Sequence, residues 1–144
     1  MNPNDKQLIK ELRRDEGVRY VPYFDTKGIH TVGVGHNLKA KPLPVRYPLT
    51  EEQVDEILYD DLVGVFSDLD RKLGWWRTLS CARQRVMANM CFNLGIGGLL
   101  GFVHTLTSIK TGNYDDASEK MLQSAWARQV GERAKRLSLM MKEG

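Results

Sequence analysis

The chain has 144 residues, of which 42% are hydrophobic and 27% charged, and its formal net charge is +3. This length fits one domain, or one domain constricted into two lobes, and the ordinary composition excludes disordered and fibrous proteins. The N-terminal stretch MNPNDKQLIK has no apolar centre, and no segment approaches the roughly 18 apolar residues of a membrane span. We therefore expect no signal peptide and no membrane insertion.

Charge is distributed unevenly along the chain. Residues 1–72 carry 11 Lys and Arg against 13 Asp and Glu, whereas residues 73–144 carry 10 against 5. A cationic second half attracts polyanions such as nucleic acid, anionic lipid or an acidic cell wall. A solvated basic helix face accounts for the same residues, so charge alone does not select a partner.

Two cysteines, Cys81 and Cys91, fall in one predicted helix. Ten residues of helix rise about 15 Å, beyond the roughly 7 Å over which a disulfide joins two Cα atoms. We expect both thiols to be free and buried, as in a reducing cytoplasm. The cysteines and the three histidines show no short ligand spacing, so the sequence predicts neither a metal site nor a cofactor.

The N-terminal third predicts a helix, a hairpin and a loop. An apolar stripe favours a helix over 5–15, which Gly17 ends. Aromatic and β-branched residues then favour strands between 18 and 34, with the DTKG at 25–28 as their turn. Residues 37–49 hold three prolines and predict a loop.

A capping box opens the next element, with Thr50 as N-cap and Gln53 at the third helical position. Apolar residues then recur every three or four positions, which predicts a helix of about 20 residues over 51–73. From Glu51 to Asp70 it carries eight acids and no base, as suits an exposed connector. Its apolar positions are Val54, Ile57, Leu58, Leu62, Val65, Leu69 and Leu73.

The second half is predicted to be helical. Residues 80–94 are apolar on most sides, which predicts a buried helix, and the GIGG at 95–98 breaks it. Further helices are expected over 99–110, 114–123, 125–129 and 132–142.

These elements predict an α+β fold in a single domain, 1–144. A small lobe at about 1–50 holds the β-hairpin, a long helix at about 51–73 connects, and an all-helical lobe occupies about 74–144. An active-site cleft is expected between the lobes.

Two carboxyls near the hairpin have different expected environments. Glu16 ends the first helix, where the negative end of the helix dipole disfavours an ionised carboxyl, and Tyr20 and Tyr23 are expected to desolvate it. Asp25 sits in a polar turn and should stay ionised. An acid beside an ionised carboxylate is the pair that glycoside hydrolysis requires, and the Thr31 hydroxyl could hold a water beside Asp25.

Spacing alone does not distinguish this pair from ordinary structure. Glu16 could form an ion pair with Arg13 or Arg19, and Asp25 could be only a turn residue. Asp15 is expected to be a surface charge.

Six segments, in order and spacing, resemble the phage-type lysozymes, the family of the T-even coliphage enzyme. They are DEG at 15–17, YFDTKGIHTVGVGHNL at 23–38, NMCFNLG at 89–95, GFVHTL at 101–106, SAWARQ at 124–129 and RAKRL at 133–137. The resemblance covers essentially the whole chain. It implies a lysozyme-like fold and a muramidase, a glycoside hydrolase that cuts the β-1,4 bond between N-acetylmuramic acid and N-acetylglucosamine in peptidoglycan.

By this resemblance Glu16 is the general acid, Asp25 the family's aspartate and Thr31 the water-positioning threonine. His36 ends the Gly-x-Gly-His pattern as a supporting residue, and Arg133 is expected behind the cleft, orienting Glu16. The residues expected to line the glycan groove are Leu38, Asn93, Phe102 and Thr105.

Three departures from the family concern the groove rather than the catalytic trio, and one of them is the short, proline-rich loop at 39–49. Asn93 stands where a longer amide is familiar, and His104 precedes Thr105 where a smaller polar residue is usual. The resemblance also suggests an inverting reaction, in which a water between Asp25 and Thr31 attacks the anomeric carbon.

The function that this resemblance implies is a phage endolysin. We expect a monomer that accumulates in the host cytoplasm and reaches the periplasmic wall once a holin has opened the inner membrane. A virion-borne enzyme used at entry is an alternative location. The alternative functions are a catalytically weak peptidoglycan-binding protein and a small basic nucleic-acid binder, the latter disfavoured because a carboxylate-bearing cleft repels phosphates.

Overall fold

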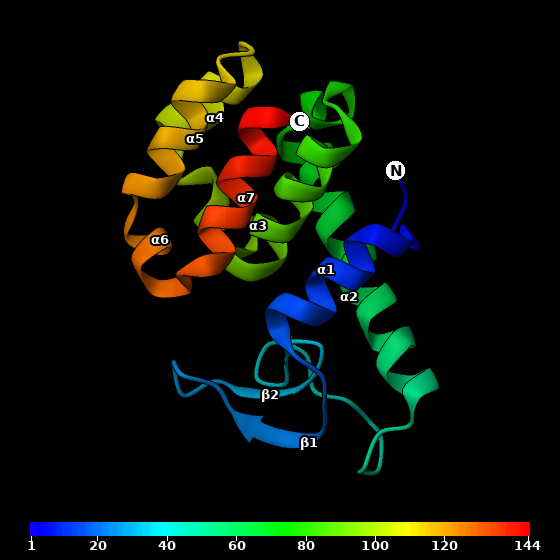
Figure 1. Ribbon diagram of the computed structural model, residues 1–144. Coiled ribbons are helices and arrows are strands. Elements are labelled where there is room, and N and C mark those ends of the chain that lie inside the picture. The colour runs from blue at the N-terminus through cyan, green and yellow to red at the C-terminus, as the bar shows by residue number, and fades with distance from the viewer. The chain divides into compact units, whose positions relative to one another are not determined.

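The computed structural model describes all 144 residues and contains seven α-helices, one 3₁₀ helix and one three-stranded antiparallel sheet (Figure 1). The predicted α+β class is confirmed. In chain order the elements are α1 (Lys6–Glu16), β1 (Arg19–Phe24), β2 (His30–Gly33), β3 (His36–Asn37), α2 (Glu51–Lys72), η1 (Gly74–Thr78), α3 (Cys81–Leu100), α4 (Val103–Lys110), α5 (Tyr114–Gln123), α6 (Ala125–Val130) and α7 (Glu132–Glu143).

The chain divides into two compact units, Asn2–Gly64 and Val65–Gly144, and Met1 groups with the second of them. The carbonyl of Met1 accepts a hydrogen bond from the Arg77 guanidinium of that unit. The division falls inside α2 rather than at one of its ends. One helix therefore contributes residues to both units.

Helix α1 begins and ends with identifiable caps. The Asp5 side chain accepts a hydrogen bond from the Leu8 amide at 2.8 Å, so one of the otherwise unsatisfied amides of the first turn is paired. The chain leaves the helix at Gly17, whose φ of 74° favours glycine. Leu8 and Leu12 are completely buried. Glu16 is the last residue of the helix.

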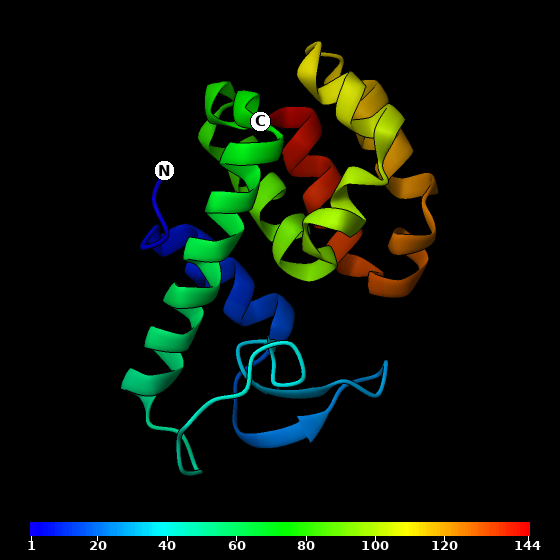
Figure 2. The same cartoon turned by 180° about the vertical axis from the view of Figure 1, so that it is seen from behind.

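The sheet has the order β1-β2-β3. Its β1–β2 hairpin follows α1 directly in the chain (Figure 2). In the β1–β2 pair Tyr23 stands opposite Thr31 and Phe24 opposite His30, with an irregular register nearer to Arg19. The hairpin and its turn at 25–28 are confirmed. Strand β3, in which His36 pairs with Val32, has only two residues and was not expected from the sequence.

Helix α2 begins with the predicted capping box. The Gln53 amide donates to the Thr50 hydroxyl at 3.1 Å, and the Thr50 amide donates to the Gln53 side chain at 2.9 Å. The helix runs for 22 residues, close to the predicted length. Its buried apolar residues, with Leu73 just beyond its end, are Val54, Leu58, Leu62, Phe66 and Leu69.

In the second unit, α7 lies beside α3 and α5, and α4 lies beside α5 (Figure 1). Helix α3 contains the predicted break at Gly95, whose φ of 73° and ψ of 162° are not helical, but the helix resumes and reaches Leu100. The next helix therefore starts at Val103 rather than at 99, with Phe102 as its N-cap.

No single helix is long and apolar enough to cross a membrane; α3 and α4, which meet at 109°, pass that test only as a bent pair. Both cysteines are free, as expected. Cys91 is buried, whereas the expectation that Cys81 is buried is wrong. Cys81 is the first residue of α3, and its side chain is exposed there.

Candidate active site

Asp25 is fixed by the turn that it opens. Its Oδ1 atom accepts hydrogen bonds from the amides of Lys27 at 2.9 Å and Ile29 at 2.8 Å. Its own amide donates to the Ile29 carbonyl at 2.9 Å, which closes the turn. Both side-chain bonds use one oxygen, so the carboxylate is oriented while Oδ2 keeps its acceptor capacity.

Thr31 is buried on β2, and its hydroxyl group donates a hydrogen bond to the backbone. Oγ1 donates to the Ile29 carbonyl at 2.7 Å. A hydroxyl that donates one bond can still accept, so Thr31 is an acceptor toward any further partner. Ile29 thereby fixes both polar groups, since its amide binds Asp25 and its carbonyl binds Thr31.

Glu16 lies near the same part of the sheet. The pKa of Tyr23 is raised by burial first and then by the negative charge of Glu16, with Arg19 opposing and Asp25 adding to the rise. Both carboxyls thus act on one phenol ring. The Arg19 guanidinium stacks over that ring at 4.4 Å from its centroid. The unit Asn2–Gly64 therefore holds Glu16, Asp25 and Thr31 on adjoining elements, around a Tyr23 that stands opposite Thr31.

Near Glu16, Tyr20 has a partner that the sequence did not predict, and the expectation for Asp15 needs correction. The Tyr20 hydroxyl donates a hydrogen bond to the Glu51 carboxylate at the start of α2. This bond raises the pKa of Tyr20 and lowers that of Glu51. Asp15 is not a surface charge, because its side chain is fully buried, with Oδ1 3.1 Å from Nε of Arg14.

His36 is buried, and both of its ring nitrogens have partners. Nδ1 lies 2.7 Å from Oδ2 of Asp61, and Nε2 lies 2.8 Å from the carbonyl of Lys41. Both partners are acceptors, so the ring satisfies them fully only as an imidazolium. Burial alone lowers the pKa of His36, but the bonds to Asp61 and Lys41 outweigh it and the pKa is raised.

Three of the residues expected to bind glycan come together in the second unit. Phe102 and Thr105 line a hollow of about 520 Å³. Trp126, also in its lining, donates from Nε1 to Oδ1 of Asn93 at 2.7 Å and meets the Phe102 ring edge to face at 6.1 Å. The lining also includes Lys120, Gln129 and Trp126, which were not among the expected groove residues. Trp126 and Gln129 fall in the SAWARQ segment that carries the family resemblance, whereas Lys120 carried no signal, since a single polar residue on a predicted helix is ordinary.

The fourth residue expected to bind glycan, Leu38, and the expected supporting residue Arg133 lie outside the lining of this hollow. Leu38 follows β3 and is half-buried, and its amide donates to the His30 carbonyl at 2.9 Å. Arg133 is buried at the start of α7, where Nε donates to Oδ1 of the fully buried Asn89 at 2.9 Å. Asn89 therefore fixes the direction of this guanidinium.

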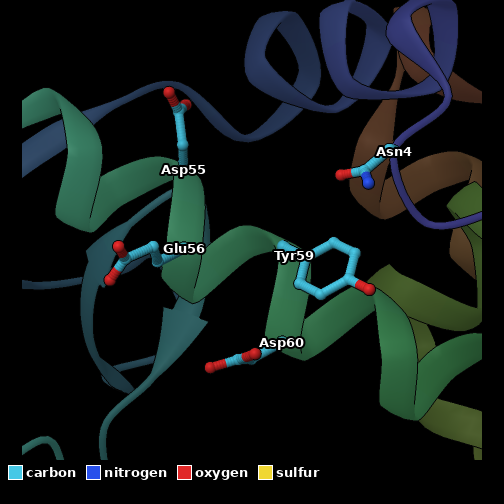
Figure 3. Close-up of a pocket in the computed structure, with 5 residues that line it drawn as sticks. All are labelled: Asn4, Asp55, Glu56, Tyr59 and Asp60. Atoms are coloured by element: carbon cyan, nitrogen blue, oxygen red, sulfur yellow. The ribbon is translucent and has the colours of Figure 1, made fainter.

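A second hollow, of about 500 Å³, lies on α2 (Figure 3). Its lining is Asn4, Asp55, Glu56, Tyr59 and Asp60, which Figure 3 labels, and none of these side chains is cationic. Three carboxylates make this surface anionic, and one of them, Asp55, lies 3.4 Å from Nη1 of Arg13. Such a surface repels an anionic polymer, so it is not the expected peptidoglycan site.

The profile of the family described as phage lysozyme matches residues 13–141 of this chain. The chain belongs to the phage lysozyme family. Membership identifies it as a peptidoglycan-hydrolysing lysozyme, a glycoside hydrolase of the muramidase class. The resemblance seen in the sequence motifs is thus confirmed, and so is the lysozyme-like α+β fold.

Individual relatives of this phage lysozyme differ in length and source. The endolysin of Salmonella phage P22 is 31% identical over 79% of this chain and 77% of its own length. Probable T4-type lysozyme 1 of Dictyostelium discoideum is 24% identical over 92% of both chains. The pre-baseplate central spike protein Gp5 of Enterobacteria phage T4 is 28% identical over 99% of this chain, which spans only 28% of that protein.

Proposed function

We propose that this phage lysozyme is an endolysin that cuts the β-1,4 bond between N-acetylmuramic acid and N-acetylglucosamine, causing host cell lysis. Glu16 is the general acid, Asp25 is the general base, and Thr31 positions the attacking water with Asp25. No cofactor takes part in this scheme.

The observation that carries the proposal is the link through Ile29. Its amide donates to Asp25 and its carbonyl accepts from Thr31, at 2.8 and 2.7 Å. Asp25 and Thr31 are therefore both acceptors toward a third group. A water that donates one proton to each of them keeps a lone pair free, and that lone pair is the nucleophile.

The reaction then balances with two carboxyls. The water oxygen bonds to the anomeric carbon of the muramic acid residue as the bond to the glycosidic oxygen breaks. Glu16 gives its proton to the departing oxygen, and Asp25 takes a proton from the water. Exchange with solvent returns Glu16 to its acid form and Asp25 to its carboxylate.

This scheme is inverting, because water attacks directly on the face opposite the leaving group. Proton NMR of freshly released muropeptides gives the anomer before mutarotation. We expect the α product from the β-linked substrate. A β product would require a covalent intermediate and would overturn the inverting scheme.

Turbidity loss of purified peptidoglycan tests the acid. Glu16→Gln keeps the size of the side chain but cannot donate a proton as a carboxylic acid does, and general acid–base catalysis contributes about 10²–10⁴-fold. We expect clearing to fall by about that factor. Glu132→Gln, the same change at an exposed residue of α7, is the matched control and should clear like the wild type. A catalytically weak wall-binding protein would bind peptidoglycan without releasing fragments.

The substrate contacts form the finer part of the proposal. We assign glycan binding to Leu38, Asn93, Phe102 and Thr105, and a supporting role to His36 and Arg133. What favours this assignment is the hollow lined by Phe102 and Thr105, and the hydrogen bond that Asn93 accepts from Trp126, another residue of that lining. Phe102→Ala should raise KM for soluble glycan strands more than it lowers kcat, as expected when uniform binding is lost.

The biological setting is also part of the proposal. An endolysin of this family would act as a monomer on the periplasmic wall after a holin has opened the inner membrane. The likeness to a phage spike protein favours a second setting, in which the domain travels with the virion. Immunodetection decides between them: presence only in infected-cell lysates supports the endolysin, and presence in purified virions supports the spike.

A further inference from the structure

Gly35 lies directly against the side chain of Glu16. A Cβ atom built on Gly35 would be 2.6 Å from Oε1 of Glu16, 2.8 Å from its Cδ and 3.0 Å from its Cγ. Real Cβ atoms essentially never approach another heavy atom within 3.0 Å. The outer part of Glu16 therefore occupies the space that a side chain at position 35 would need.

This contact joins two separate elements of the unit Asn2–Gly64. Glu16 is the last residue of α1, and Gly35 lies between β2 and β3, nineteen positions later. The position of the carboxyl relative to the sheet is thus limited on one side by bare backbone. A backbone surface is stiffer than a side chain, because it has no rotamers to change.

Gly33, two residues earlier, serves as a comparison for Gly35. It shares the positive φ but not the contact with Glu16. Gly33 and Gly35 have φ values of 66° and 63°, a region that favours glycine at both positions. A Cβ on Gly33 would meet only Cδ1 of Leu49, at 3.9 Å, which is an ordinary contact. Gly33 is required by the backbone alone, whereas Gly35 is also required by Glu16.

We propose that Gly35 is a positioning residue for the general acid, and that its missing side chain leaves the space in which the Glu16 carboxyl is held for proton transfer. The proposal rests on the role proposed for Glu16. Restoring an ordinary contact with an added Cβ would lengthen the distance to Oε1 from 2.6 to 3.4 Å. A misplacement of about 1 Å costs about 10²-fold in rate.

Adding a Cβ atom at position 35 should reduce catalysis more than it reduces the stability of the fold. The atoms that an added Cβ would meet belong to the far end of a flexible side chain. Glu16 can turn away while the backbone stays, so a variant at position 35 keeps the fold and loses the placement of its acid. Backbone strain from a positive φ is common to positions 33 and 35 and cancels in their comparison.

The test compares Gly35→Ala with Gly33→Ala. Both variants should show a similar drop in melting temperature, because both place alanine at a positive φ. In Gly35→Ala alone, kcat on soluble glycan strands should fall by about 10²-fold with KM unchanged. In the same variant alone, the Glu16 Cδ resonance in protein labelled with ¹³C-glutamate should shift, its assignment coming from the peak lost in Glu16→Gln.

The outcomes separate this inference from the role of Glu16. A Glu16 resonance that does not move in Gly35→Ala overturns the inference, and so does an equal loss of kcat in both variants. A shifted resonance with full turnover supports the contact but contradicts Glu16 as the acid, in which case Glu16→Gln is active too. If the alanine variants do not fold, Gly35→Asn and Gly33→Asn replace them, since asparagine tolerates a positive φ and still carries a Cβ.

Discussion

His36 is a buried residue through which pH should act on stability near neutrality. It is buried between the Asp61 carboxylate and the Lys41 carbonyl, and its pKa in the folded protein lies above the ordinary 6.5. A raised pKa in the folded state means that the bonded imidazolium stabilises the fold fully below pH 6.5. That contribution is lost as the pH rises through the folded pKa.

Comparison with Asp61→Asn measures this contribution. At low pH the variant should be less stable than the wild type by about 1.5–3 kcal/mol, the range for a hydrogen bond to a charged group. Because the wild type loses the imidazolium as the pH rises, the gap should narrow on going from about pH 6 to pH 9. Thermal unfolding followed by circular dichroism gives both curves, and a gap independent of pH would contradict the assignment.

The two cysteines should differ sharply in reactivity. Burial first, and then the nearby charge of Asp68, raise the pKa of the Cys91 thiol to about 12. Cys81 is exposed. Because the thiolate is the reactive form, a thiol reagent should modify one site in the native protein and two after unfolding. Native Cys81→Ser should give no reaction, and modification of that variant would show that Cys91 is accessible.

At the scale of elements, two glycines in helices should respond to alanine with opposite signs. Gly64 lies inside α2 and has open space around it, whereas Gly95 interrupts α3 with a φ of 73°. Gly64→Ala should raise the free energy of unfolding by about 0.4–1 kcal/mol, because alanine restricts the unfolded chain. Gly95→Ala should lower it by more than that, because alanine is strained at a positive φ.

Urea unfolding of these two variants provides the measurement. Each serves as the control for the other, since the chemical change is identical and only the backbone conformation differs. Equal shifts of the midpoint in the same direction would contradict the helix break at Gly95.

Elements determined by residues that are close together in the sequence were predictable from it. The Thr50–Gln53 capping box needs only residues three apart, and the turn after Phe24 needs only Asp25 and the residues just beyond it. Strand β3 was missed because two residues carry no period, and it is defined by its partner Val32. The start of α4 was misplaced because α3 resumes after Gly95.

In the candidate site too, features set by nearby residues were predictable, whereas contacts between distant segments were not. The types of Glu16, Asp25 and Thr31 and their place near the hairpin could be read from motifs. The contact of Glu16 with Gly35 and the burial of Asp15 could not, since each depends on how separate segments pack. The hydrogen bond that the Thr31 hydroxyl donates to the Ile29 carbonyl also depends on how the folded backbone places that carbonyl.

At the scale of the whole molecule, the uneven charge should govern the encounter with the wall. Residues 73–144 carry 10 basic against 5 acidic side chains, and this excess attracts an anionic polymer. Clearing of purified peptidoglycan should therefore slow as salt rises, because the Debye length falls from about 30 Å at 0.01 M to about 10 Å at 0.1 M. Rates that stay constant across this series would show that the charge plays no part.

The division of the chain inside α2 has a spectroscopic consequence. All three tryptophans, Trp75, Trp76 and Trp126, fall in Val65–Gly144, whereas four of the five tyrosines fall in Asn2–Gly64. Tryptophan fluorescence, excited at wavelengths that tyrosine does not absorb, therefore reports on Val65–Gly144. Tyrosine absorbance reports mainly on Asn2–Gly64, and neither measurement needs an attached label. Coincident transitions from the two chromophores would indicate that the two units unfold together, and separated transitions would give each unit its own midpoint.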